Sequence, residues 1–373
     1  MDNLTHTLFG LTLSRTPLGR AGRGVTTALV LASNAPDIDV VTAVRGGTSY
    51  LQWHRGPTHG PLGVIVLGLL TAALVRSGQR FVDRRGKRTP DDPEAPFGML
   101  VAASMVGVFC HILMDFPTSY GTRLLSPFSW HWFASDLMPI VDIYLIIVLV
   151  AGLLFGASSA EARRRNVAIV FVLMAANYGV RAVAHHQAIA LAPRVFGPLM
   201  PRPCETAPDN QMLLSVWPRA VNPTMPPASV SSRCLIEVAA IPSFFSPFRW
   251  RVISQLSNSY DMHDVDVLDA RLRGPVQPGD GPWRVTVHYP NVWRPPVLSA
   301  AAAPIAQVFL GFSRFPAARS FPDPKTGTAT VRWIDVRFAG GLTLDQRLGR
   351  SGLFQATVRV DQDGRVVDER LGP

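Results

Sequence analysis

Long apolar runs alternate with polar, basic stretches over the first half of the chain and then stop. Six segments are apolar enough to form buried or membrane helices, at 4–18, 24–34, 61–76, 97–116, 138–157 and 166–191. The first two are shorter than the roughly 20 residues that an α-helix needs to cross a bilayer. We expect these two to be partly embedded or shielded by neighbours, whereas 138–157 is the clearest predicted membrane helix.

Proline-rich sequence and strand-like runs replace the apolar segments after residue 192. The runs lie at 234–240, 249–256, 283–289, 331–338 and 353–360, and residues 361–364 resemble a hairpin turn. We therefore predict a mainly α membrane bundle of about four to six helices over 1–192, a Pro-rich linker over 193–232 and a β-rich extramembrane domain over 233–373. A soluble protein with buried helices is the alternative, and the length of 138–157 disfavours it.

The net charge of +10 comes almost wholly from arginine, since Lys87 and Lys325 are the only lysines. Basic residues cluster in the loops 15–23, 76–88 and 163–165, which hold 12 of them, whereas the loops 35–60 and 117–137 hold 3. The positive-inside rule places the basic loops in the cytoplasm. We expect a multi-pass protein of a bacterial inner membrane, in contact with membrane lipids and with its C-terminal domain outside the cytoplasm. No nucleic-acid partner is expected, because no nucleic-acid-binding module accompanies the basic residues.

Three cysteines are too few for a disulfide scaffold. Cys110 lies within an apolar segment and is interpreted as a small core residue. Cys204 and Cys234 follow the last apolar segment, and we predict that they pair if that region is exported. The amino terminus carries Asp2 and His6 in place of a basic stretch, so we expect no cleavable signal peptide.

Histidines and aspartates gather at the ends of the apolar segments opposite the arginines. His111 and Asp115 are spaced i, i+4 and share one helix face, a typical support for Zn²⁺ or another divalent ion. His54 and His59 flank a tight Gly-Pro loop that can aim both imidazoles inward. The alternatives are a His–Asp hydrogen bond between helices for the first pair and solvated loop histidines for the second.

Asp37 and Asp39 follow the second apolar segment, near Asn34. Because they alternate across Ile38, one can face a metal ion while the other orients a histidine; a turn and cap cluster is the alternative. His6, taken alone, is typical of a structural residue after a capping sequence. Two more carboxylates, those of Asp136 and Asp142, flank the start of segment 138–157. Five further histidines are interpreted as structural or surface residues: His131, His185, His186, His263 and His288.

Four stretches carry a resemblance to a known family: Asp2–Gly10, Asn34–Asp39, His54–Gly60 and His111–Asp115, the last continuing through 116–123 and 127–129. Over roughly residues 1–155 the chain resembles the YdjM-like family of inner-membrane proteins, described as predicted membrane-bound metal-dependent hydrolases. The resemblance implies such an activity here, with ligands drawn from these histidines and aspartates.

We therefore expect a metal-dependent hydrolase acting on a phosphoester of a lipid or cell-envelope substrate, with a divalent ion, Zn²⁺ by preference, as cofactor. The expected ligands are His6, His54, His59, His111 and Asp115. Catalytic roles are expected for Asp37, Asp39 and Arg55, and supporting or substrate-binding roles for Asn34, Arg123, Asp136 and Asp142. The rival hypothesis is a non-catalytic, metal-stabilised membrane scaffold or regulatory protein. A transporter is disfavoured because the ionisable groups lie at helix ends.

Overall fold

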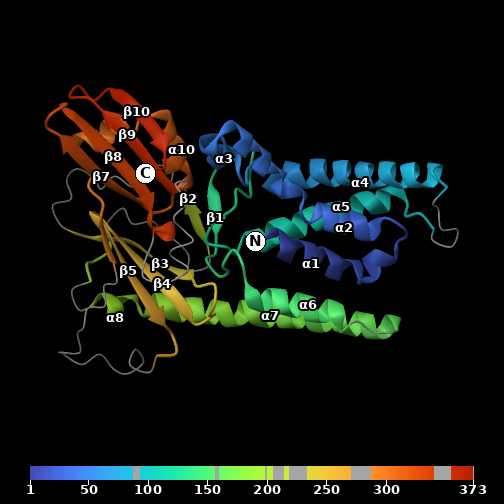
Figure 1. Cartoon of the computed structure of the whole chain (residues 1–373). Helices are drawn as coiled ribbons and strands as arrows, with labels where there is room; N and C mark the ends of the chain where they lie inside the picture. The colour runs from blue at the N-terminus through green and yellow to red at the C-terminus, as the bar shows by residue number, and fades with distance from the viewer. Residues whose placement is uncertain are drawn as a thin grey trace. The chain divides into compact units, whose positions relative to one another are not determined.

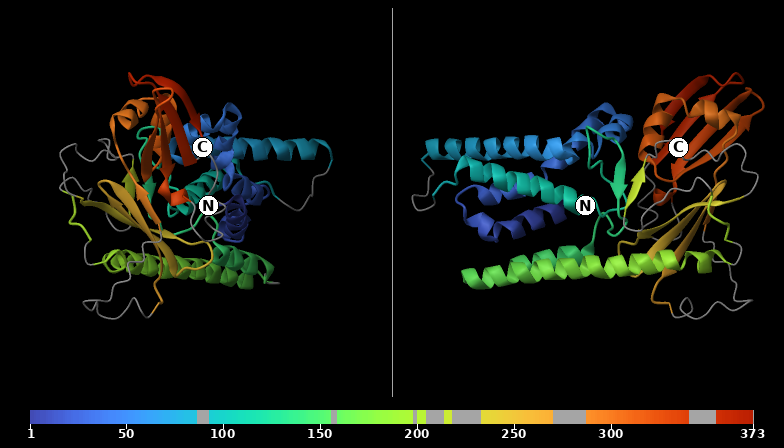
Figure 2. Two further views of the ribbon diagram at one scale, coloured as in Figure 1. Left: turned by 60° about the vertical axis from the view of Figure 1, so that its left-hand side comes forward. Right: turned by 180° about the vertical axis from the view of Figure 1, so that it is seen from behind.

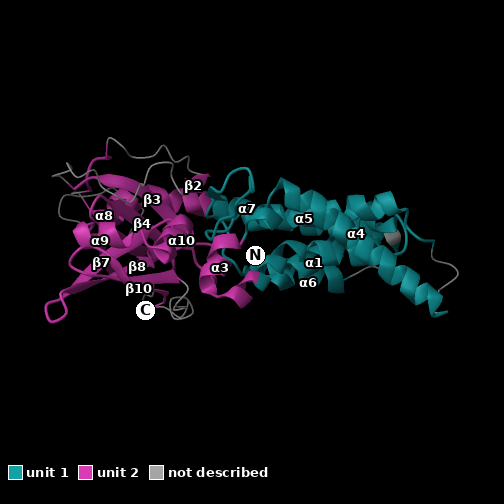
Figure 3. Ribbon diagram, turned by 90° about the horizontal axis from the view of Figure 1, so that it is seen from above, with its two compact units in different colours: residues 1–41, 55–182 teal, residues 42–54, 183–373 magenta. Residues whose placement is uncertain are grey.

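The computed structural model describes residues 1–86, 93–155, 159–197, 200–204, 214–217, 233–269, 287–339 and 354–372. The chain divides into two compact units, residues 1–41 with 55–182, and residues 42–54 with 183–373 (Figure 3). The first unit is helical and the second contains antiparallel sheets, which confirms the predicted fold class. The predicted ranges 1–192, 193–232 and 233–373 stay predictions, and much of 193–232 lies outside the described residues.

In the described part of the first unit, six α-helices begin (Figure 1): α1 Asn3–Ser14, α2 Val25–Ala32, α4 Pro61–Arg84, α5 Phe97–Asp115, α6 Ile143–Leu154 and α7 Ala160–Ala190. Short elements connect them: η1 Pro17–Arg20, η2 Ala35–Arg45, η3 Pro57–His59 and β1 Trp132–Ala134. Within the described residues, three helices are long and apolar enough to cross a membrane: Pro61–Arg84, Phe97–Asp115 and Glu161–Ala190. The pair α2 and η2, bent by 42°, is a fourth candidate when counted as one span.

The segment 138–157 was wrongly predicted to be the clearest membrane helix. Among the described residues of this segment, Ile143–Leu154 is helical and is too short to count among the candidate spans. The start is fixed by Asp142, whose carboxylate caps the helix by accepting a hydrogen bond from the backbone N–H of Leu145 at 2.8 Å. The apolar residues before Asp142 therefore raise the mean hydropathy of segment 138–157, but they are not part of the helix.

Glycines allow the helices of the first unit to pack closely against one another. A Cβ atom at Gly107 of α5 would lie 2.7 Å from Ala32 of α2, and one at Gly68 of α4 would lie 2.6 Å from the Met105 side chain of α5. At Gly10 of α1 the nearest α2 backbone atom would be 3.1 Å away. Small residues at such contacts let helix backbones approach closely, as is common between membrane helices.

The basic loops share one end of the helical unit. The ends of α1, α4 and α6 and the start of α7 lie there, opposite the end of α5 (Figures 1 and 2). An ion-pair network ties two of these loops together. Arg23 pairs with Asp83 at 2.6 Å and with Glu94 at 2.8 Å, and Arg76 pairs with Glu94 at 2.6 Å. The end of α5, with His111 and Asp115, therefore lies at the end of the helical unit away from these basic loops.

The described residues of the second unit form two four-stranded antiparallel sheets, in the orders β3-β4-β5-β6 and β10-β9-β8-β7. Their strands are β3 Leu235–Pro242, β4 Arg249–Leu256, β5 Ser259–Asp266, β6 Val287–Pro290, β7 Pro316–Asp323, β8 Thr328–Asp335, β9 Gln355–Val360 and β10 Val366–Leu371. The remaining elements of this unit are α3 Gly47–Trp53, α8 Ala192–Phe196, β2 Ser215–Trp217, α9 Pro295–Ala300, α10 Pro304–Phe312 and η5 Val336–Phe338. A disulfide joins Cys204 and Cys234, which confirms the predicted pairing.

Candidate metal centre

The last turn of α5 supplies two of the side chains at the candidate centre. His111 and Asp115 are one turn apart on a single helix face, and both are buried. Their facing atoms, His111 Nε2 and Asp115 Oδ2, are 3.5 Å apart. The i, i+4 spacing in the sequence therefore places two potential ligand atoms close together in the structure.

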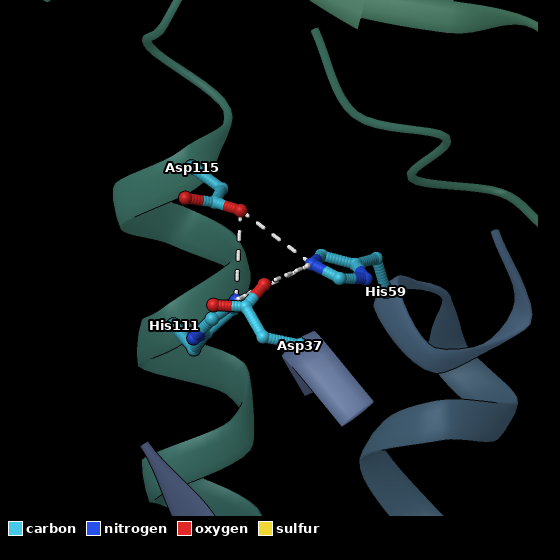
Figure 4. Close-up of side chains that lie close together, drawn as sticks. All are labelled: Asp37, His59, His111 and Asp115. Carbon is cyan, nitrogen blue, oxygen red and sulfur yellow. Dashed lines mark hydrogen bonds and ion pairs between the residues drawn. The ribbon is translucent and has the colours of Figure 1, made fainter. Parts of the chain in front are cut away.

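Asp37 and His59 complete the cluster from two short elements, η2 and η3 (Figure 4). Asp37 Oδ1 lies 3.5 Å from His111 Nε2 and 3.6 Å from His59 Nε2. His59 Nε2 in turn lies 3.3 Å from His111 Nε2 and 3.5 Å from Asp115 Oδ2. The four ligand atoms all lie within 4.8 Å of one another, so segments 78 residues apart in sequence converge on one point.

The protonation pattern of the two histidines fits a cation between them. Nδ1 of His111 is 2.8 Å from the carbonyl oxygen of Ser33, which can only accept a hydrogen bond, so His111 carries its proton on Nδ1. Nδ1 of His59 faces the hydroxyl of Thr58 at 3.0 Å and the carboxylate of Asp39 at 3.5 Å. Each Nε2 atom then presents a lone pair to the other, and two carboxylate oxygens add further negative charge.

The spacing of the ligand atoms agrees with the same interpretation. Bonds of about 2.0–2.1 Å around a tetrahedral ion place neighbouring ligand atoms about 3.3 Å apart. Five of the six separations within the cluster run from 3.3 to 3.6 Å, and all six lie within 4.8 Å. Four hydrogen-bond acceptors at these distances repel one another unless a cation or a proton lies between them, and the residues present therefore fit a divalent metal ion.

Burial lowers the pKa of His59 to about 3. Its imidazole is therefore neutral at physiological pH, as metal ligation requires. Burial therefore keeps His59 in the neutral form that can bind a metal ion.

Asp39 orients His59 from behind. Its carboxylate is 3.5 Å from His59 Nδ1 and also accepts hydrogen bonds from the backbone N–H of Arg55 at 2.7 Å and from the hydroxyl of Thr58 at 3.3 Å. Arg55 adopts a positive φ of 50°, which is uncommon outside glycine, in the turn that delivers this N–H. A carboxylate behind a ligand histidine fixes the ring orientation and raises its basicity.

We expect Asp39→Asn to weaken metal binding by about 10- to 100-fold, because the amide keeps the shape of the side chain but removes the charge behind His59. Competition with a chelator measures this affinity. Asp83→Asn, which alters a carboxylate at the opposite end of the bundle, is the matched control and should bind metal as the wild type does. Equal affinity in all three proteins would show that Asp39 does not support the site.

Positive charge and a third imidazole surround Asp115. Arg55 Nη2 lies 3.0 Å from Oδ2, while Nη1 donates to Thr118 Oγ1 at 3.1 Å and to the carbonyl of Gly121 at 2.9 Å. His6 Nε2 lies 3.3 Å from the other oxygen, Oδ1, which the amino group of Met1 also contacts. The His6 ring stacks on His111 with centroids 3.8 Å apart. His6 thus lies beside the cluster and faces the far oxygen of Asp115.

Several predicted residues lie elsewhere. His54 ends α3 in the second unit and stacks on Tyr50, with ring centroids 4.4 Å apart. Asn34 donates hydrogen bonds to Thr7 Oγ1 at 3.1 Å and to the carbonyl of Val30 at 2.9 Å. Asp142 caps α6 and forms an ion pair with Arg181. None of these three side chains belongs to the four-residue cluster.

Arg123 and Asp136 belong to the loop after α5. The guanidinium of Arg123 lies 4.3 Å from the ring centroid of Trp132 and 4.9 Å from that of Trp130, and its backbone N–H donates to the carbonyl of Arg55 at 3.2 Å. Burial lowers the pKa of Arg123 to about 10, which leaves the side chain charged at neutral pH. Asp136 is buried and has a positive φ of 56°. Neither belongs to the four-residue cluster.

Two groups that contact the ligand histidines were not predicted from the sequence. The carbonyl of Ser33 fixes the tautomer of His111, and the hydroxyl of Thr58, which can donate or accept, lies 3.0 Å from Nδ1 of His59. A backbone carbonyl leaves no trace in a sequence, because every residue has one. Thr58 did carry a signal, since it lies directly before His59 in the Gly-Pro loop.

Comparison with known proteins gives two matches. The family described as "YdjM inner membrane protein" matches residues 1–188. A curated protein of Bacillus subtilis (strain 168), "Uncharacterized protein YfhP", is 27% identical over 155 residues, which cover 39% of this chain and 43% of that protein. The chain therefore matches less than half of that relative's length. No solved structure matches the chain.

Proposed function

This chain is a member of the YdjM family of inner membrane proteins, and we propose that it is a membrane-bound metal-dependent hydrolase of phosphoesters. The observation that carries the proposal is the convergence of Asp37, His59, His111 and Asp115 at metal-ligand spacing. Two imidazoles and two carboxylates form a mixed N/O donor set, which suits Zn²⁺ among the first-row divalent ions. We propose Zn²⁺ as the resident ion.

A bound divalent ion supplies Lewis acidity, which brings the ionisation of water close to neutral pH and polarises a substrate oxygen. Asp37 presents Oδ1 as a ligand, and we propose that its other carboxylate oxygen, Oδ2, accepts a proton from the attacking water. Its side chain is 20% exposed, whereas those of the other three cluster residues are fully buried. Arg55 supplies a guanidinium beside the cluster, 3.0 Å from Asp115, and we propose that it binds the phosphoryl oxygens.

The rival function is a metal-stabilised scaffold, and the cluster itself gives it support. Four protein ligands are enough to close a tetrahedral site, and closed sites are structural. The partial exposure of Asp37 favours the hydrolase, because it leaves one side of the cluster open to water and substrate. The two functions therefore differ in whether the bound ion keeps a position for water.

Hydrolysis of p-nitrophenyl phosphate and bis-p-nitrophenyl phosphate by the detergent-purified protein tests the proposal. We expect turnover of at least one ester, loss of turnover with a chelator, and recovery when Zn²⁺ is restored. A folded, metal-loaded protein that hydrolyses neither these nor lipid phosphoesters would identify the site as structural.

We further propose that the metal centre and the second unit face the outside of the cytoplasm. The Arg-rich loops at the opposite end of the bundle and the disulfide between Cys204 and Cys234 support this orientation. Reporter fusions at residue 90 and after residue 373 should report opposite compartments, the first cytoplasmic. The same compartment for both fusions would contradict this topology.

A further inference from the structure

The 11-residue η2 sorts its side chains into three rows, because residues three apart eclipse one another in a 3₁₀-helix. Pro36 and Asp39 form the inward row and are buried, and Asp39 reaches the loop before His59. Asp37 begins a second row at the metal centre. Ile38 and Val41 form the third row and are 59% and 62% exposed. One short element therefore presents a ligand (Asp37), the carboxylate that orients His59 (Asp39) and an exposed apolar stripe, Ile38 and Val41.

Asp37 on η2 is the one cluster residue whose side chain is partly exposed, at 20% against 0% for the other three. We infer that a substrate approaches the ligand atoms from this side. The residues that flank this approach on η2 are Ile38 and Val40, both exposed and apolar. Apolar side chains therefore border this approach. A fully hydrated substrate gains no free energy by contacting them.

Two observations indicate that membrane hydrocarbon covers this stripe. First, α2 and η2 together are long and apolar enough to form a span, with a 42° bend between them just before Asp37. Second, the loop after α5 carries Phe128 and Trp130, both exposed, and aromatic residues of this kind favour the membrane interface. This loop packs directly against the loop of His59, since a Cβ atom at Gly60 would overlap the carbonyl oxygen of Ser126.

We propose that the substrate is a membrane phospholipid, whose acyl chains lie along Ile38 and Val41 while its phosphate group enters beside Asp37. This inference rests on the proposed hydrolase function and deepens it. Arg55, buried and positively charged beside the cluster, suits an anionic headgroup, and the apolar stripe suits the chains.

The reaction balances without a co-reactant other than water. The water oxygen forms a new bond to phosphorus, and the P–O bond to the leaving alcohol breaks. One water proton passes to Asp37 and then to the departing alkoxide, so that phosphatidic acid yields diacylglycerol and inorganic phosphate. Phosphatidylglycerol, a diester, yields an alcohol and a phosphomonoester in the same way.

Lipids and their deacylated counterparts test the proposal directly. The substrates are dioleoyl phosphatidic acid and dioleoyl phosphatidylglycerol in mixed micelles, beside glycerol 3-phosphate and glycerophosphoglycerol in solution. We expect the wild type to prefer a lipid over its deacylated counterpart in kcat/KM. In the variant Ile38→Ser/Val41→Ser this preference should fall by about tenfold, because burial of apolar side chains by the acyl chains is lost.

Ile147→Ser is the matched control, since Ile147 on α6 is also 62% exposed but lies outside η2. Its lipid preference should equal that of the wild type. An equal loss of preference in both variants would overturn the role of η2. Hydrolysis of the p-nitrophenyl esters together with no preference for lipids would overturn the lipid substrate and leave the hydrolase standing.

A second measurement is independent of activity. Phosphatidic acid with a diazirine in its acyl chain is photo-crosslinked to the metal-loaded protein in vesicles, and the labelled peptides are identified by mass spectrometry. We expect label within residues 35–41 and expect excess dioleoyl phosphatidic acid to compete it away. Labelling confined to α4, α6 and α7, or label in 35–41 that resists competition, would contradict the proposal.

Discussion

Replacing His111 by alanine should remove the metal ion and the hydrolytic activity together. Its Nε2 atom lies within 3.3–3.5 Å of a ligand atom from each of the other three cluster residues, so it faces the centre of the cluster. Loss of one ligand from such a small set leaves the ion incompletely coordinated, and we expect affinity to fall by at least about 100-fold. Metal content of the folded, monodisperse protein measures the effect.

His54→Ala is the matched control for this experiment. It removes a histidine from the same sequence motif as His59, but the structure places His54 on Tyr50 in the second unit. We expect His54→Ala to retain its metal. Loss of metal from His54→Ala with retention in His111→Ala would reverse the ligand assignment. His185 serves less well as a control, because it is buried against Trp250 and its replacement disturbs packing.

The second large expected effect is on the free energy of unfolding and not on metal binding. Asp142 and Arg181 form an ion pair in which both side chains are fully buried. Asp142→Asn keeps a capping side chain at the start of α6 but leaves the Arg181 charge without its carboxylate. Breaking a buried pair in this way costs about 3 kcal/mol or more of unfolding free energy, which unfolding in SDS mixed micelles measures.

The double variant Asp142→Asn/Arg181→Met separates charge from packing. It removes both charges, so we expect it to recover most of the stability lost in Asp142→Asn. Metal content of each folded variant should stay at the wild-type level, because neither residue belongs to the cluster. A double variant no more stable than Asp142→Asn would show that the buried charge is not the cause.

The α5 part of the site was predictable because a helix converts sequence spacing into geometry. His111 and Asp115 share a face whatever surrounds them, once the segment is helical. The choice between His54 and His59 was not predictable in this way. It depends on the turn at Arg55, where a positive φ and a hydrogen bond to Asp39 direct the chain so that His59 faces the cluster. Sequence spacing carries no information about such a turn.

The roles of Asp37 and Asp39 were predicted only as alternatives. Period-two alternation puts them on opposite sides, but it does not say which side faces the histidines. The 3₁₀ geometry of η2 decides it, since Asp39 falls in the inward row with Pro36 while Asp37 faces the cluster. A 3₁₀ run of this length is unusual and has no compositional signature.

The strands that escaped prediction lack the usual composition. In β5, Ser259–Asp266, several polar residues interrupt the apolar alternation, and the strand forms because β4 and β6 pair with it on both sides. In β7, Pro316–Asp323, proline is tolerated because the strand lies at the edge of its sheet. Of the predicted run 283–289, residues 283–286 lie outside the described part of the chain, and β6 begins at Val287.

The most direct test of the metal centre is the metal-to-protein ratio of the purified wild type beside that of the double variant His59→Ala/His111→Ala. Both proteins are loaded with Zn²⁺, dialysed, confirmed to be folded and analysed by elemental mass spectrometry. We expect a stoichiometric ion in the wild type and almost none in the double variant, because both imidazole ligands are gone. Full occupancy in the folded double variant, or an empty wild type, would contradict a metal centre at the end of α5.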